Sequence, residues 1–131
     1  MENIIKRKSY DLEDRTFLFA KAALNFSNAI PKTIANNEGV KQLVRSAGSV
    51  GANYNEANEA LSKKDFAMRV KICRKEAKET VYWLKLLQTE NADIEKNRES
   101  LVQEASELMK IFGAIVEKTK DFGWLPAQHS L

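Results

Sequence analysis

The sequence has little cysteine, histidine, proline or glycine: its 131 residues include one cysteine, one histidine, two prolines and five glycines. Because Cys73 has no second thiol to pair with, an internal disulfide framework is excluded, and a reducing cytoplasm is favoured over secretion. The single histidine, His129, lies in the C-terminal tail, which excludes a serine–histidine–acid catalytic arrangement. Gly48 and Gly51 follow no predicted strand and precede no Lys-Ser or Lys-Thr pair, so they do not make a phosphate-binding loop.

Long apolar runs are also missing. No stretch approaches the length that crosses a bilayer, and the N-terminal residues MENIIKRKSYDLEDR lack the apolar core of a signal peptide. We therefore expect a cytoplasmic protein with no membrane partner. Charge is abundant but uneven: residues 63–88 hold eight Lys or Arg against three Asp or Glu. This concentration of positive charge is an electrostatic hint of an anionic partner.

Apolar residues recur every three or four positions in four segments, which predicts four α-helices. We expect the first between a cap at Asp11 and Pro31, the second after Asn36-Asn37, the third from a cap at Ser62, and the fourth from Asn91 or Asp93 to a cap at Gly123. Short loops make sequential helices antiparallel. The prediction is an all-α fold, an up-down-up-down antiparallel four-helix bundle in one domain spanning 1–131, with an N-terminal arm (1–9) and a loosely held tail (124–131).

The apolar positions of these segments predict the core of the bundle. Two additional apolar rows predict more buried surface than one bundle needs, and therefore self-assembly. The first row is Phe17, Ala20 and Leu24, and the second is Val102, Met109 and Val116, which has the spacing of a partner-facing seam or of a wide core face. The expected core residues are Phe19, Ala23, Phe26, Ile30, Val40, Leu43, Ala47, Val50, Tyr54, Ala57, Leu61, Phe66, Val70, Cys73, Ala77, Val81, Leu84, Leu87, Leu101, Ala105, Leu108, Phe112, Ile115 and Phe122.

The second segment contains two glycines within a helical pattern, although each costs roughly 0.5–1 kcal/mol relative to alanine. Ala47, Gly48, Gly51 and Ala52 leave one flank almost without side chains, which favours close approach of another backbone over the alternative, a kink. A polar band runs beside this flank, and any buried member needs a hydrogen-bonding partner. The band is Arg45, Ser49, Asn53 and Glu56, and its possible partners in the third segment are Lys75, Glu76 and Glu79.

Two long runs carry a family resemblance: RSAGSVGANYNEANEALSKKDF (Arg45–Phe66) and ICRKEAKETVYWLKLL (Ile72–Leu87). They resemble the bacterial four-helix-bundle family of proteins encoded in 23S rRNA intervening sequences, which shares its fold with the accessory protein of diversity-generating retroelements. The resemblance implies a homopentameric ring of bundles, RNA or DNA binding through positive surface, and, for the retroelement relatives, partnership with a reverse transcriptase. It implies no catalytic residues.

A row of lysines on the third segment is the best candidate for a functional site. Its members lie two residues from core positions, about 200° around a helix, so they point away from the core. Lysines on one face can neutralise phosphates without reading sequence, and a ring would repeat them; the alternative is an ordinary solvated face. The predicted nucleic-acid-binding residues are Lys64, Lys71, Lys75, Lys78 and Lys85 with the flanking Arg69 and Arg74, and the arm residues Lys6, Arg7 and Lys8 can add to them.

Other side chains with possible chemistry have simpler interpretations. Paired carboxylates, Glu56 with Glu59 and Glu76 with Glu79, permit a di-metal site, but that chemistry also uses histidines near the carboxylates, so salt bridges are favoured. Cys73 lies in the core row and is expected to be a buried structural thiol. Trp83 and its neighbour Tyr82 can stack on bases, although Trp83 is expected at a subunit contact or under the first helix.

From the sequence we therefore predict a cytoplasmic, non-enzymatic, self-assembling protein without cofactors. Its predicted activity is that of a nucleic-acid-associated adaptor of low sequence specificity. The alternatives are a protein-interaction scaffold that does not touch nucleic acid and, as a minor one, a carboxylate-bound metal enzyme.

Overall fold

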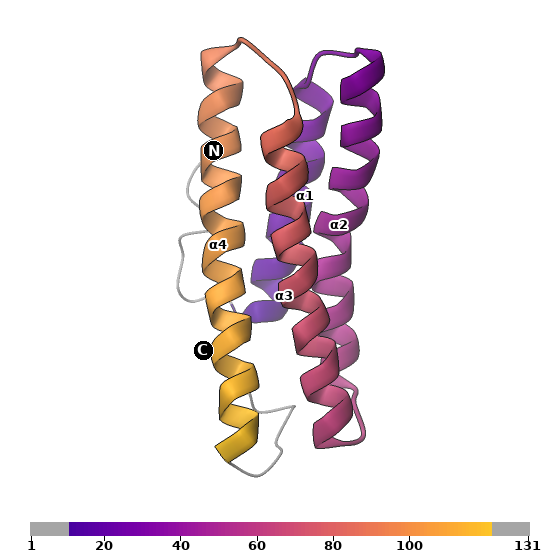
Figure 1. The fold of residues 1–131 in the computed structure, drawn as a ribbon, viewed down its shortest axis with the longest axis vertical. Coiled ribbons are helices and arrows are strands. Elements are labelled where there is room, and N and C mark those ends of the chain that lie inside the picture. Colours follow the sequence, from indigo (N-terminus) through magenta and orange to yellow (C-terminus); the bar gives the residue numbers. More distant parts are fainter. Residues whose placement is uncertain (1–10, 122–131) are drawn as a thin grey trace.

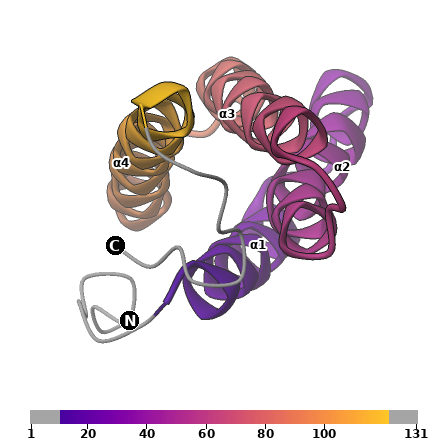
Figure 2. The same ribbon diagram turned by 90° about the horizontal axis from the view of Figure 1, so that it is seen from below.

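The computed structural model describes residues 11–121, and this part of the chain is entirely α-helical outside short connections. The helices are α1 (Leu12–Ala29), α2 (Ile34–Asn58), α3 (Lys63–Leu86) and α4 (Ala92–Asp121). They alternate in direction (Figure 1), and each packs on its sequence neighbours while α1 also packs on α4 (Figure 2). The predicted four-helix bundle is confirmed. The arm, the tail, Phe122 and Gly123 lie outside the described residues.

Helix starts follow the capping residues in the sequence. The side chains of Asp11 and Ser62 accept hydrogen bonds from backbone amides three residues on, at 2.9 and 3.0 Å, as predicted. Asn91, one of two expected caps, does the same for α4 at 3.0 Å. The predicted start of α2 is wrong, because Thr33 caps that helix and it begins at Ile34.

The core agrees with the predicted apolar positions at nearly every described residue. Phe19, Phe66 and Phe112 are fully buried, as are the aliphatic residues around them. Leu61 is an exception, at 92% exposed, because α2 ends at Asn58 and leaves Leu61 in the loop. Val40 and Val81 are half-buried rather than central. Thr80, which the apolar pattern did not predict, is fully buried and hydrogen-bonded.

The two additional apolar rows have different positions in the bundle. On α4, Val102 and Met109 pack against the core and Val116 is buried, so this row is the broad inner face of the helix. This supports the alternative interpretation of the row, a wide core face, while the seam with another copy stays a prediction. On α1, by contrast, Phe17 and Leu24 remain 64% and 46% exposed. The chain therefore leaves apolar surface uncovered on α1.

A buried ion pair that sequence spacing did not reveal joins α1 to α4. Arg15 donates to both carboxylate oxygens of Glu104, at 2.6 and 2.8 Å, and to Glu107 at 2.8 Å. Glu104 is 2% exposed, and this burial raises its pKa despite the opposing effect of Arg15. The contact also raises the pKa of Arg15, which stays charged in either case. The pair fixes the register of the two helices that are furthest apart in sequence.

Candidate nucleic-acid interface

The outward face of α3 carries the predicted basic row. Phe66, Val70 and Cys73 turn into the core, and positions two residues away from the core series turn outward. We call the residues on this outward line the outer row: it alternates spacings of four and three, and all its members are exposed. The outer row is Lys64, Met68, Lys71, Lys75, Lys78, Tyr82 and Lys85.

The outer row is a line of positive charge along α3. At 1.5 Å per residue, the 21 steps from its first to its last lysine span roughly 31 Å. Among residues 11–121, no salt bridge involves any of its five lysines, although the charge of Lys75 acts on nearby Glu79. Met68 and Tyr82, 53% and 57% exposed, interrupt the lysines with apolar surface. The row therefore combines unpaired cations with exposed hydrophobic groups.

The two arginines predicted beside the row have different environments. Arg69 is half-buried and donates to Oδ1 of Asn53 on α2 at 3.1 Å. Arg74 is exposed and extends over α4, where a Cβ added to Gly113 would lie 3.5 Å from its Nη1. Arg69 therefore serves helix packing, whereas Arg74 widens the positive surface towards α4.

The polar band of α2 meets α3 largely as expected. Arg45 forms ion pairs with Glu79 and, at 3.4 Å, with Glu76, while Asn53 bonds to both oxygens of Ser49 at 2.9 Å. A hydrogen bond from the Trp83 indole at 3.0 Å, supplemented by Arg45, lowers the pKa of Glu79. Trp83 is thus tied to Glu79 of its own helix, which in turn pairs with Arg45 of α2, and its expected place at a subunit contact or under α1 stays a prediction.

Two of the residues named for this band lie at the surface. Glu56 is exposed on α2, so burial places no demand on its carboxylate. Lys75 belongs to the outer row, although its charge helps to lower the pKa of Glu79. The metal interpretation also has no support in residues 11–121, where no three His, Cys, Asp or Glu side chains gather to hold an ion. Arg45 pairs with Glu79 and more loosely with Glu76, whose buried Oε1 has no hydrogen-bond partner among the described residues.

The two glycines of α2 have unequal surroundings. A Cβ on Gly51 would lie 3.0 Å from Oγ1 and 3.3 Å from Cβ of Thr16, so α1 approaches α2 closely there, as predicted. A Cβ on Gly48 would meet nothing within 4 Å. Within the single chain, the prediction of close packing is thus confirmed at Gly51 and wrong at Gly48.

Cys73 is buried, as expected, and burial raises the pKa of its thiol to about 12. At neutral pH it is therefore protonated and a poor nucleophile. None of the described helices has the length and apolarity needed to cross a membrane.

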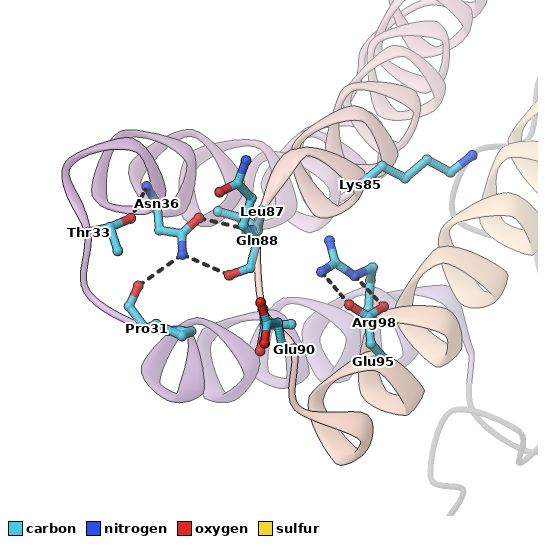
Figure 3. A pocket seen from close by; sticks show the side chains of 10 residues that line it. Pro31, Thr33, Asn36, Lys85, Leu87, Gln88, Glu90, Glu95 and Arg98 are labelled. Carbon is cyan, nitrogen blue, oxygen red and sulfur yellow. Dashed lines mark hydrogen bonds and ion pairs between the residues drawn. The ribbon is translucent and has the colours of Figure 1, made fainter.

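The end of the bundle that holds the α1–α2 and α3–α4 loops contains a hollow (Figure 3). Asn36, 2% exposed, bonds to the carbonyls of Pro31 and Gln88 at 3.0 and 2.9 Å and accepts from the Gln88 amide at 3.0 Å. Arg98 is engaged by Glu95 and by the backbone oxygen of Leu84. Figure 3 shows the Lys85 side chain pointing away from Asn36 and Arg98. Hydrogen bonds and an ion pair within the chain therefore hold Asn36 and Arg98 in place at the hollow.

The sequence patterns did not predict the structural roles of Asn36 and Arg98. Each bonds to backbone groups far along the chain, and periodicity carries no information about such contacts. A polar residue two positions into a helix, directly after a proline-containing loop, was the one available signal for Asn36.

Comparison with known proteins gives a matching family model and matching solved structures. The family model described as 23S rRNA-intervening sequence protein matches residues 8–114. A crystal structure of a protein with unknown function from the S23 ribosomal protein family of Bacteroides thetaiotaomicron is 32% identical, with a TM-score of 0.67, covering 80% of this chain and 97% of that one. No curated protein matches the chain significantly.

Proposed function

The chain belongs to the family of 23S rRNA-intervening sequence proteins, and from that premise we propose a self-assembling, non-enzymatic adaptor that binds RNA or DNA backbones with low sequence specificity. The observation that carries this proposal is the outer row of α3, with five exposed lysines that form no salt bridge with the described residues. Lysines that neutralise phosphates release condensed counterions, which gives affinity without sequence readout.

Self-assembly would multiply this weak site. Phe17 and Leu24 lie seven residues apart on α1, on one exposed face, and supply apolar area for a contact between copies. The family resemblance implies a homopentameric ring, in which five outer rows would engage one long nucleic acid with avidity. In this proposal the protein acts in the cytoplasm and delivers nucleic acid to a processing protein such as a reverse transcriptase.

The test uses a triple charge reversal, Lys71→Glu, Lys75→Glu and Lys78→Glu. We expect wild-type affinity for an RNA oligonucleotide to fall steeply with salt, and the reversal to weaken binding more than 100-fold because three phosphate contacts become repulsive. The matched control reverses three exposed lysines that lie away from the outer row and from Arg74, namely Lys32, Lys96 and Lys118, which changes the net charge equally.

The control should bind RNA within a few-fold of wild type, and both variants should keep their helical circular dichroism and thermal midpoint. Equal losses in the two variants would mean that net charge alone attracts RNA. Absent or salt-independent binding by wild type would contradict the proposal and favour a protein-interaction scaffold. Light scattering after gel filtration tests the assembly, and a monomer at micromolar concentration would contradict it.

A further inference from the structure

One exposed aromatic ring lies within the line of lysines on α3. Tyr82 is 57% exposed, and Lys78 and Lys85 of the outer row lie four residues before and three residues after it. On a helix these spacings place the two lysines on either side of the ring, with their Cα atoms about 10.5 Å apart along the axis. The arrangement offers two phosphate contacts with a flat apolar surface between them.

The position of this ring is fixed by its neighbours. The Tyr82 and Trp83 rings meet edge to face, with centroids 4.9 Å apart and an interplanar angle of 82°. Trp83 donates to Glu79, which pairs with Arg45 of α2. An edge-to-face contact covers at most one face of the tyrosine. The other face is therefore available to a flat ligand, and more than half of the side chain is exposed.

We propose that Tyr82 gives the outer row a preference for single-stranded nucleic acid, by stacking an unpaired base while the flanking lysines contact its phosphates. This inference rests on the proposed function. In a duplex each base is stacked between its neighbours and presents an edge in the grooves, so its face is closed to a side chain on a convex helix. Bases of a single strand can turn out and stack on an aromatic ring, whatever their identity.

The experiment compares a single-stranded RNA oligonucleotide with a duplex of the same length at one salt concentration. We expect Tyr82→Ala to weaken single-strand binding about tenfold and to leave duplex binding within twofold, because one stacking contact is lost. Tyr82→Phe, which keeps the ring, should bind as wild type. The matched control is Leu86→Ala on the same helix, a similarly exposed apolar side chain without a π face, and it should leave both affinities unchanged.

Other outcomes overturn the inference. Equal weakening of both substrates by Tyr82→Ala would show a general effect on the surface, and no weakening of single-strand binding would show that the ring is not used. If the lysine reversals abolish binding while Tyr82→Ala changes nothing, this inference fails and the proposed function stands. If wild type binds neither RNA, both fail.

Discussion

The contrast between Gly51 and Gly48 gives a sharp test of how α1 and α2 pack. The same substitution, glycine to alanine, is made in one helix at two positions three residues apart. At Gly48 the new methyl group meets nothing within 4 Å, so the helix gains only the propensity advantage of alanine. We expect Gly48→Ala to raise the free energy of unfolding by about 0.5–1 kcal/mol.

At Gly51 the same gain is opposed by a steric clash. The new Cβ would lie 3.3 Å from Cβ of Thr16, inside the 3.5–4.0 Å optimum of carbon–carbon contacts. Thr16 cannot turn aside freely, because it is 1% exposed and its hydroxyl donates to the Leu12 carbonyl at 2.7 Å. Overpacking of this kind costs about 1–3 kcal/mol, which outweighs the propensity term. We therefore expect Gly51→Ala to lower the free energy of unfolding.

The assay is urea and thermal unfolding followed by circular dichroism, at one protein concentration because self-association raises apparent stability. The two variants should differ by about 1–3 kcal/mol, or roughly 3–5 °C in thermal midpoint for each kcal/mol. Thr16→Ala removes the hydroxyl that lies 3.0 Å from the added carbon, so it should reduce the penalty of Gly51→Ala in the double variant. If Gly51→Ala stabilises the chain as much as Gly48→Ala, the close approach of α1 is refuted.

Three further predictions concern buried polar and ionisable groups. Asn36→Ala should lower the free energy of unfolding by about 2–4 kcal/mol, because it strands backbone groups of Pro31 and Gln88, and a urea midpoint equal to wild type would contradict this. Cys73 in the native protein at pH 8 should react with a thiol reagent far more slowly than in urea, since its pKa is about 12; stoichiometric labelling of folded protein within seconds would be inconsistent with its burial. Relative to Glu104→Gln, the wild type should lose stability as pH rises above 4.5, because folding raises the pKa of the Glu104 carboxyl and the folded state therefore binds its proton more tightly. Paired urea titrations measure this difference, and a gain in stability of the wild type over that range would contradict the direction of the shift.

Much of the fold follows from local sequence rules. Asp11, Ser62 and Asn91 cap helices because a side-chain oxygen three residues before a free amide satisfies it, and this needs no knowledge of the rest of the chain. The outward position of the lysines also follows from spacing alone, since a helix turns two residues through about 200°. Their role in binding stays a prediction.

Contacts between helices were harder to foresee. Gly48 and Gly51 look equivalent in sequence, yet only the second lies opposite Thr16, because the crossing point of α1 and α2 depends on the packing of the whole bundle. Arg15 and Glu104, 89 residues apart, were missed for the same reason. Val102 and Met109 have the spacing of a seam, but spacing cannot tell whether the facing surface belongs to the same chain.

The three bonds of Asn36 make the two ends of the bundle unequal. At one end the Asn36 side chain links Pro31, in the α1–α2 loop, to Gln88, in the α3–α4 loop. A chain break in either loop would therefore disturb these hydrogen bonds. At the other end the loop 59–62 exposes Leu61 almost fully, and its residues Glu59 and Ala60 bond only to the final turn of α2 among the described residues. We expect a domain inserted next to Leu61, between the buried Ala60 and the Ser62 cap of α3, to leave the packing of the four helices intact.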